Sequence, residues 1–377
     1  MSLRVVQVNC VIDGDRREPD DLLDAWPTLP AIAEATAAAG AEVAVLVASH
    51  KAASCRREGV AYRFVPEPRL RAGSGPGLFP WRLAAAVRDE RPDVVHFNGF
   101  DFPFHARAIC GAGTPALVQD HGSRAGGRRA ALRRWGYGRI AGAAFAAAEQ
   151  AEPFRRHRQI PSGAAVFAIP ESSTRFRPGS RAEARAATGL YGDPALLWVG
   201  HLDANKDPLT ILEGVRRVLP AFPSLQLWCA YGSAPLMPEI ERLLRSDPAL
   251  AAHVHLLGRV AHDRVETLCR AADLFVSCSR RESTGYALIE ALACGLTPIV
   301  ADIPSFREAT SRGDVGALVP PGDAQGFAAA IAAFAVRPLQ ASRSEARDHF
   351  ERNLSFEVVG RKLVQAYRFL AAGGAPP

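Results

Sequence analysis

The sequence has 377 residues, 48% of them hydrophobic and 22% charged, which is an ordinary composition for a soluble globular protein. One hydrophobic core stops growing at about 250–300 residues, so two domains are expected. The net charge of +6 is compatible with an anionic ligand, a nucleic acid or a lipid surface, and no stretch approaches the ~20 apolar residues that a membrane-spanning helix needs.

Short apolar runs recur along the first half of the chain, and several lack the polar alternation of a half-exposed strand. They predict strands at residues 4–9, 42–48, 61–65, 94–97, 116–119, 142–145 and 166–169. Helix-length segments separate them. One is Thr28–Ala39, which Gly40 closes just before the next strand.

The second half repeats this rhythm, with strands predicted at residues 196–199, 225–230, 254–257, 274–278, 298–301 and 316–319. Alternating strands and helices are typical of doubly wound parallel sheets. Two such sets predict two Rossmann-like domains, with a boundary in the polar, turn-rich stretch between Pro170 and Pro194. We expect domains at 1–172 and 173–354, then a helix and tail at 355–377 whose helix, roughly Phe356–Leu370, could pack back towards the first domain.

The seven cysteines include no C-x-x-C pair, and four of them lie in apolar runs: Cys229, Cys269, Cys278 and Cys294. Buried reduced thiols are therefore expected rather than disulfides. The chain starts directly in a strand-like run, without a basic-then-apolar signal segment. These features predict a cytoplasmic protein, with a peripheral position at the inner membrane face left open.

The richest group of polar residues follows the strand at 274–278, and ligands of open α/β sheets bind beyond the carboxyl ends of strands. Glu282 lies in the loop, and Ser283, Thr284 and Gly285 can begin a helix whose exposed N–H groups suit a phosphate. Glu290 is expected two turns inside that helix. Eight residues of helix advance about 12 Å, comparable to the span from a sugar across a diphosphate to a ribose, so the two carboxylates could hold the two ends.

The run from Asp273 to Ala301 resembles the glutamate–seven residues–glutamate motif of the family-4 retaining glycosyltransferases, which have the GT-B fold. Other segments agree with the family in order and spacing: Leu197–Lys206 with its "VGRL"–lysine loop, Leu256–Val260 with its base-contacting loop, Arg91–His96 with its "PDVVH" element, and His121-Gly122 with its "HG" element. The resemblance covers nearly the whole chain and is strongest from Leu196 to Val319. It implies two Rossmann-like doubly wound parallel-sheet domains that face each other across a cleft.

The resemblance also implies roles for individual residues. Lys206 would bind the donor phosphates and stabilise the leaving group, Glu282 the transferred sugar, Glu290 the ribose, and His121 would face the sugar from the first domain. The implied catalytic set is Glu282, Lys206 and His121; the implied donor-binding set is His201, Lys206, Arg259, Glu282, Ser283, Thr284, Gly285, Tyr286 and Glu290.

Three segments depart from the family pattern. His201 stands where the family has a phosphate-site arginine, which makes stabilisation of the leaving group weaker or pH-dependent. Asp24–Pro30 stands in place of a glycine-rich loop, and Pro170–Thr174 in place of a "PNGVD"-like segment.

Each assignment has a purely structural alternative. Lys206 could be a surface lysine, and His121 could be a core histidine. For His96, a structural role is favoured over a functional one. The spacing of the two glutamates could belong to a solvated helix face, but Glu290 lies among apolar residues, where an unpaired charge would be expensive, and this favours the functional interpretation. The six arginines within Arg124–Arg139 either form a solvated helix face or attract an anionic acceptor or a membrane surface; nucleic acid is not expected, because no recognised module surrounds them.

The expected function is that of a hexosyltransferase that takes a sugar from a nucleoside diphosphate sugar, UDP rather than GDP, and passes it with retention to an unidentified acceptor. No metal and no cofactor are expected, because no D-x-D motif stands where a metal-dependent transferase would carry one and Lys206 with a helix N-terminus can stabilise the leaving charge. Two alternatives stay open: a non-catalytic subunit that binds sugar nucleotides, and a sugar-nucleotide epimerase on the same fold. The oligomeric state is not indicated.

Overall fold

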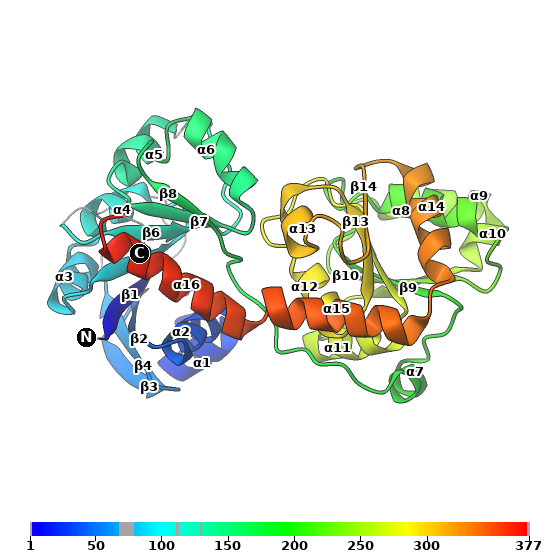
Figure 1. Ribbon diagram of the computed structural model, residues 1–377, viewed down its shortest axis with the longest axis horizontal. Helices are drawn as coiled ribbons and strands as arrows, with labels where there is room; N and C mark the ends of the chain where they lie inside the picture. Colours follow the sequence, from blue (N-terminus) through cyan, green and yellow to red (C-terminus); the bar gives the residue numbers. More distant parts are fainter. Residues whose placement is uncertain (1, 68–78, 111–112, 129, 375–377) are drawn as a thin grey trace. The chain divides into compact units, whose positions relative to one another are not determined.

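The computed structural model describes residues 2–67, 79–110, 113–128 and 130–374. The chain forms two compact α/β units (Figure 1). Unit 1 contains residues 1–172 and 356–377, and unit 2 contains residues 173–355. Arg129 of the arginine-rich segment lies outside the described residues.

Unit 1 is built on an eight-stranded sheet of order β3-β4-β2-β1-β5-β6-β7-β8, in which the β3–β4 pair is antiparallel and the other pairs are parallel. The strands are β1 (Leu3–Asn9), β2 (Ala41–Ser49), β3 (Ala53–Arg57), β4 (Val60–Pro66), β5 (Val94–Asn98), β6 (Ala116–Gln119), β7 (Gly142–Phe145) and β8 (Ala165–Ala168). The seven strands expected from the sequence are present. The sequence analysis missed β3 because this edge strand has no apolar run and is largely exposed.

The helices of unit 1 include a late segment of the chain. They are α1 (Pro19–Ala25), α2 (Thr28–Ala38), α3 (Trp81–Asp89), α4 (Pro103–Ile109), α5 (Ala130–Tyr137), α6 (Glu152–Arg156), the 3₁₀ turn Ala148–Ala151, and α16 (Phe356–Ala371). In Figure 1, α16 lies beside α2, and it also contacts β5 and β6. The Tyr367 hydroxyl of α16 lies 2.5 Å from Nδ1 of His96 on β5. Burial lowers the pKa of His96 to about 3, with a smaller contribution from His121, so His96 is a neutral structural residue that ties α16 to the sheet.

Unit 2 has a six-stranded, all-parallel sheet of order β11-β10-β9-β12-β13-β14. The strands are β9 (Ala195–Gly200), β10 (Gln226–Tyr231), β11 (Val254–Gly258), β12 (Leu274–Ser277), β13 (Thr297–Ala301) and β14 (Ala317–Val319). The chain builds outward from β9 through β10 to β11, then returns to the other side of β9 with β12. The order of the sheet therefore reverses between β9 and β12. The sequence-based prediction of doubly wound parallel sheets is confirmed.

Both faces of the unit 2 sheet are covered by helices, which explains its continuous apolar strands. The helices are α7 (Arg181–Thr188), α8 (Pro208–Val218), α9 (Met237–Ser246), α10 (Pro248–Ala251), α11 (His262–Ala271), α12 (Tyr286–Ala293), α13 (Pro304–Ala309), α14 (Ala324–Ala335) and α15 (Leu339–Asn353). Successive residues of β9 face opposite sides: Leu197 packs in the core with α11, α12 and α15, whereas Leu196 and Trp198 pack with α8 and α14.

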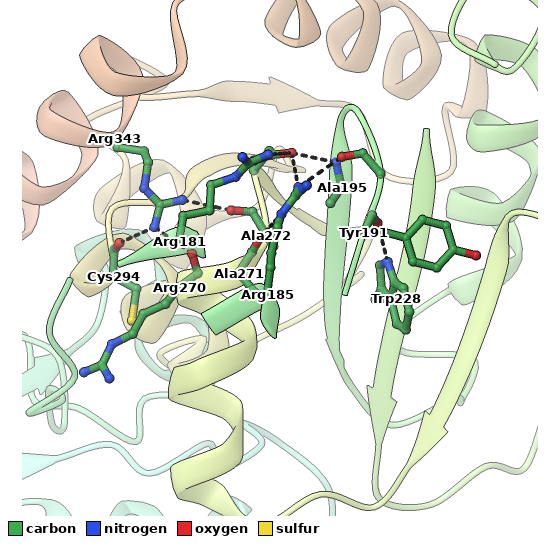
Figure 2. A network of polar contacts seen from close by, with 12 residues as sticks. Arg181, Arg185, Tyr191, Ala195, Trp228, Arg270, Ala271, Ala272, Cys294 and Arg343 are labelled. Carbon is green, nitrogen blue, oxygen red and sulfur yellow. Dashed lines mark hydrogen bonds and ion pairs between the residues drawn. The ribbon is translucent and has the colours of Figure 1, made fainter. Parts of the chain in front are cut away.

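A buried polar network holds the start of β12 (Figure 2). Asp273, which is 5% exposed, accepts hydrogen bonds from Nε of Arg181 at 2.7 Å, from Arg185 at 3.0 Å and from the backbone N–H of Ala195 at 2.8 Å. Arg343 of α15 donates to the carbonyls of Ala272, Arg270 and Cys294. The network thereby joins α7 and the start of β9 to the C-terminal ends of α11 and α12.

Two further expectations concern the cysteines and membrane-spanning helices. The seven cysteines are free thiols, and all except the half-buried Cys55 are buried. Among the described residues, no helix is both long and apolar enough to cross a bilayer.

Candidate functional site

Two loops meet where the order of the unit 2 sheet reverses. One runs from His201 to Asp207 after β9, and the other from Ser279 to Gly285 after β12. These strands are neighbours, with Leu196 paired to Leu274. In open α/β sheets, ligands bind outside the carboxyl ends of the strands at such a reversal. The sheet therefore places both loops where a ligand site is expected.

Hydrogen bonds join the two loops directly. The backbone N–H of Arg280 donates to the carbonyl of Asn205 at 2.8 Å, and the Asn205 side chain donates to the carbonyl of Arg281 at 3.0 Å. The Arg280 guanidinium also pairs with the largely buried Asp207 carboxylate at 2.7 Å. Because Lys206 lies between Asn205 and Asp207, these contacts hold its backbone from both sides.

Lys206 and Glu282, two of the predicted catalytic residues, are brought together by this arrangement. Their Nζ and Oε1 atoms are 2.5 Å apart, and the two side chains are only 22% and 14% exposed. The backbone N–H of Lys206 donates to Asp203 Oδ1 at 2.8 Å. The site thus holds one cation and one carboxylate in contact in a mostly desolvated position, where electrostatic interactions are stronger than in water.

The segment after Glu282 is less helical than the sequence suggested. Helix α12 begins at Tyr286, so Ser283, Thr284 and Gly285 precede it and the expected helical start at Ser283 is wrong. Gly285 has a φ of +81°, and a Cβ there would lie 2.6 Å from the Phe306 ring. A left-handed residue in that space must be glycine, and a helix cannot run through it.

The side chains around the start of α12 differ in exposure. Thr284 is buried, at 3% exposed, and among the described residues its Oγ1 has no hydrogen-bond partner. Tyr286 is 37% exposed at the first helical position. The first N–H groups of a helix have no intrahelical acceptor and attract anions.

Glu290 lies just over one turn inside α12 rather than two, because the helix starts late. Its Oε1 atom is 2.6 Å from Nε2 of His262, the first residue of α11, and the carboxylate is 12% exposed. The His262 ring packs against Phe176 with ring centroids 4.9 Å apart. The hydrogen bond to Glu290 is the largest factor that raises the pKa of His262, and the charges of Glu290, Asp263 and Glu266 act in the same direction.

The sequence analysis missed His262. It lies shortly after the segment Leu256–Val260 that resembles the base-contacting loop, but nothing in the sequence indicates contact with a residue 28 positions later. The sequence did contain one signal of such a partner: the charge of Glu290 lies among apolar neighbours, where it would be costly if it were unpaired.

His201 and Arg259 occupy more exposed positions at the same edge of the sheet. Nδ1 of His201 accepts the backbone N–H of Ser233 at 3.1 Å, so a neutral ring carries its proton on Nε2. Arg259 directly follows β11, the edge strand. Within the described parts of the chain, its side chain makes no ion pair or hydrogen bond, and the structure does not bring it into contact with the other predicted residues.

His121 is the predicted site residue that belongs to unit 1. It follows β6, and its Nε2 lies 3.2 Å from Asn98 Oδ1 at the end of the neighbouring strand β5. Its Nδ1 lies 2.8 Å from Oε2 of Glu171, whose side chain is 7% exposed. Sequence reasoning missed Asn98 and Glu171, although Glu171 is part of the Pro170–Thr174 segment that departs from the family pattern.

The described residues contain no group of three or more His, Cys, Asp or Glu side chains arranged to hold a metal ion. The carboxylates of the unit 2 site are instead in contact with Lys206 and His262.

Comparisons with known proteins agree with this architecture. Residues 193–335 match the family model described as glycosyl transferases group 1, and residues 25–170 match the glycosyl transferase 4-like domain. The D-inositol 3-phosphate glycosyltransferase of Rhodococcus jostii is 32% identical over 231 residues, which are 58% of this chain and 50% of that protein. The chain spans about half the length of the curated relatives it matches.

Solved structures show the same fold. Sucrose-phosphate synthase from Thermosynechococcus elongatus has a TM-score of 0.69 at 19% identity, covering 98% of this chain and 100% of that one. Anabaena HepE, solved in complex with UDP and glucose, has a TM-score of 0.66 at 14% identity and covers 97% and 99%. Matching models over both units, together with two parallel-sheet α/β units, show that the chain belongs to the family-4 glycosyltransferases of the GT-B fold.

Proposed function

We propose that this protein transfers a hexosyl group from a nucleoside diphosphate sugar to an acceptor, with retention of the anomeric configuration and without a metal ion. The observation that carries the proposal is the contact between Lys206 and Glu282 where the unit 2 sheet reverses, immediately before α12. Family membership supports the reaction class.

The charges around α12 suit the two ends of such a donor. Lys206 and the N-terminus of α12 supply positive charge for a diphosphate. Glu282 can accept hydrogen bonds from sugar hydroxyls, and its contact with Lys206 holds the carboxylate in place before the donor arrives. Glu290, held by His262, is proposed to accept hydrogen bonds from the ribose.

The chemical step needs stabilisation of the departing phosphate more than a protein base. In the proposed mechanism, the acceptor hydroxyl attacks on the face from which the phosphate leaves, and the phosphate takes the proton. Lys206 and the helix N-terminus then stabilise the charge that develops on the leaving group. His201 would donate one N–H from Nε2, which is weaker than the planar fork of an arginine. The role of His121, contact with the sugar, rests on the family resemblance.

The proposed donor is a UDP-sugar in preference to a GDP-sugar. This preference is supported by the structural neighbour Anabaena HepE, which was solved with UDP and glucose. The acceptor named for the Rhodococcus relative, D-inositol 3-phosphate, is the first to assay. We propose that the protein works in the cytoplasm.

A thermal-shift screen against nucleoside diphosphate sugars tests donor binding. A ligand at 100 times its Kd adds about 2.7 kcal/mol, and about 2–4 °C per kcal/mol is expected for a unit of this size. The shift should therefore be roughly 5–11 °C for the true donor. No shift with any sugar nucleotide would contradict the proposal.

Product analysis then tests the reaction. NMR of the product should show the anomeric configuration of the donor, and an inverted product would refute retention. Donor binding without transfer or hydrolysis would indicate a non-catalytic subunit, and an isomerised sugar released without acceptor would indicate an epimerase.

A lysine substitution with a matched control links the activity to the site. Loss of one preorganised charge that stabilises a leaving group typically costs about 10²–10³ in kcat, which is the loss expected for Lys206→Met. The control is Lys51→Met, which removes a lysine from an exposed pair with Glu18 in unit 1 and should leave kcat unchanged. Equal effects would remove Lys206 from the proposed mechanism.

A further inference from the structure

Four aromatic side chains from three parts of unit 1 pack into one cluster near its surface. Phe79 stacks on Trp81, the first residue of α3, with ring centroids 5.3 Å apart. Phe79 also contacts Phe104 of α4 at 5.6 Å and Trp135 of α5 at 6.1 Å, and Phe104 lies 5.5 Å from Trp135. We call these four residues the aromatic cluster.

Close packing of α4 and α5 makes this cluster possible. A Cβ on Gly136 would lie 2.4 Å from the carbonyl oxygen of Pro103, so only glycine allows α5 to approach the start of α4 this closely. The neighbouring Trp135 is thereby set against Phe104. The arrangement of the cluster thus depends on the close packing of two helices and not only on side-chain rotamers at the surface.

Two tryptophans of the cluster remain open to solvent. Trp81 is 63% exposed and Trp135 is 41% exposed. Single exposed apolar side chains are common, but tryptophans that gather on one exposed patch mark an interaction surface. An indole ring is favoured where one side is apolar and the other is wet, as in the headgroup layer of a membrane.

The chain around the cluster is strongly basic. Between Phe102 and Ala148 it carries seven arginines and a single carboxylate, Asp120, and that carboxylate is buried. The Arg107 guanidinium lies over the Trp135 ring, 5.4 Å from its centroid. Arg128 and Arg134 are exposed and, among the described residues, neither pairs with a carboxylate. Arg133 is already engaged by Asp101.

We propose that the aromatic cluster and its exposed arginines form a surface that docks unit 1 onto an anionic lipid bilayer. Arginines would contact lipid phosphates, and the tryptophan rings would enter the headgroup layer. Charge complementarity selects this occupant over a second copy of the chain, because two such surfaces facing each other would repel. The inference goes beyond the proposed sugar transfer and does not depend on it.

Vesicle co-sedimentation with the full chain tests the proposal. The protein should sediment with vesicles of phosphatidylcholine and phosphatidylglycerol, and much less with phosphatidylcholine alone. Raised salt should release it, because screening weakens headgroup attraction. Each arginine near an anionic surface contributes about 1 kcal/mol, a factor of about five, so Arg134→Glu should weaken partitioning at least about fivefold.

Two matched controls lie in unit 2. Arg242→Glu makes the same charge change at an exposed arginine of α9, and Tyr191→Ser removes an aromatic side chain that is 54% exposed. Trp81→Ser should weaken vesicle binding several-fold, whereas both controls should have no effect. Quenching of tryptophan fluorescence by brominated lipid should be reduced in Trp81→Ser.

Several results would overturn the proposal. They are absence of binding to anionic vesicles, equal binding to neutral vesicles, and losses as large in the unit 2 controls. A soluble polyanion such as heparin or RNA is the remaining competitor. If it binds more tightly than the vesicles, and Trp81→Ser leaves both unchanged, the surface is a polyanion site and not a membrane-docking surface. These readouts use no donor, so they fail or succeed separately from the transferase assays.

Discussion

Replacement of Asp273 by alanine should be the most destabilising single change in the polar network of unit 2. The carboxylate is 5% exposed and receives hydrogen bonds from two arginines and from the N–H of Ala195. Ala195 is fully buried at the start of β9. Asp273→Ala therefore leaves a buried N–H without this acceptor and removes the anion that faces Arg181 and Arg185.

The magnitude follows from these contacts. An unsatisfied buried donor costs about 1–3 kcal/mol, and breaking a buried ion pair costs about 3–5 kcal/mol. The side chains of Arg181 and Arg185 are 34% and 22% exposed, so water recovers part of the loss and the lower end applies. We expect about 3 kcal/mol, which for a unit of this size lowers Tm by roughly 6–12 °C.

Scanning calorimetry with a matched control can check this value. Glu213 is also held by two arginines, Arg216 and Arg217, but on the surface of α8, where both arginines are nearly half exposed. Exposed pairs contribute at most about 1 kcal/mol, so Glu213→Ala should change Tm by no more than a few degrees. Asp273→Asn, which keeps an acceptor for Ala195, should lie between the two. Equal shifts for the two alanine variants would refute the reasoning from burial.

Four other outcomes are expected. Calorimetry should show that Glu290→Gln weakens binding of the free nucleoside diphosphate by about 1.5–3 kcal/mol, the value of a hydrogen bond to a charged group. Glu282→Gln should leave this affinity nearly unchanged and mainly lower kcat, and equal losses of affinity would show that Glu282 is misassigned. EDTA should leave transfer unaffected, and activity that is lost on chelation and restored by manganese or magnesium would contradict this. The pKa of His262 is raised in the folded protein, chiefly by the hydrogen bond to Glu290, so its stabilising contribution is present at low pH and is lost as the pH rises through that raised value. The difference in unfolding free energy between wild type and His262→Gln should be below about 1 kcal/mol for this exposed histidine; the corresponding Tm difference should shrink towards alkaline pH, and one that grows would be inconsistent with the pair. Tyr367→Phe should destabilise unit 1 by about 1–3 kcal/mol, because it leaves the buried Nδ1 of His96 without its partner, and an unchanged Tm would argue against this anchor.

The local sequence pattern was sufficient to predict the strands that have continuous apolar runs. The apolar runs of β9 and β12 are buried on both faces, and such runs can be recognised without knowledge of their neighbours. Where the pattern is weak, prediction failed: β3 has no apolar run, and α12 starts at Tyr286 because Gly285 has a left-handed backbone, at a position where the Phe306 ring leaves no room for a Cβ. The ring belongs to a later helix, so no reading of the residues around Gly285 could have included it.

For the candidate site, too, the sequence determined some features and the tertiary structure determined others. The sequence alone determined which loops carry Lys206 and Glu282 and which helix carries Glu290, because the residue types and spacing of a motif are local properties. Only the tertiary structure decided their partners. Lys206 meets Glu282 across 76 positions because the sheet reverses its order between β9 and β12, and His262 meets Glu290 because α11 and α12 pack together.

The surface of unit 1 gives the same lesson. The sequence determined that Arg124–Arg139 is rich in arginine, and it left open whether this is a solvated face or a binding surface. The packing of α3, α4 and α5 decided that Trp81 joins Trp135 there. Hydrophobic periodicity reports which face of an element is buried, but the neighbour that buries it, and the rings left exposed, depend on contacts between segments far apart in the chain.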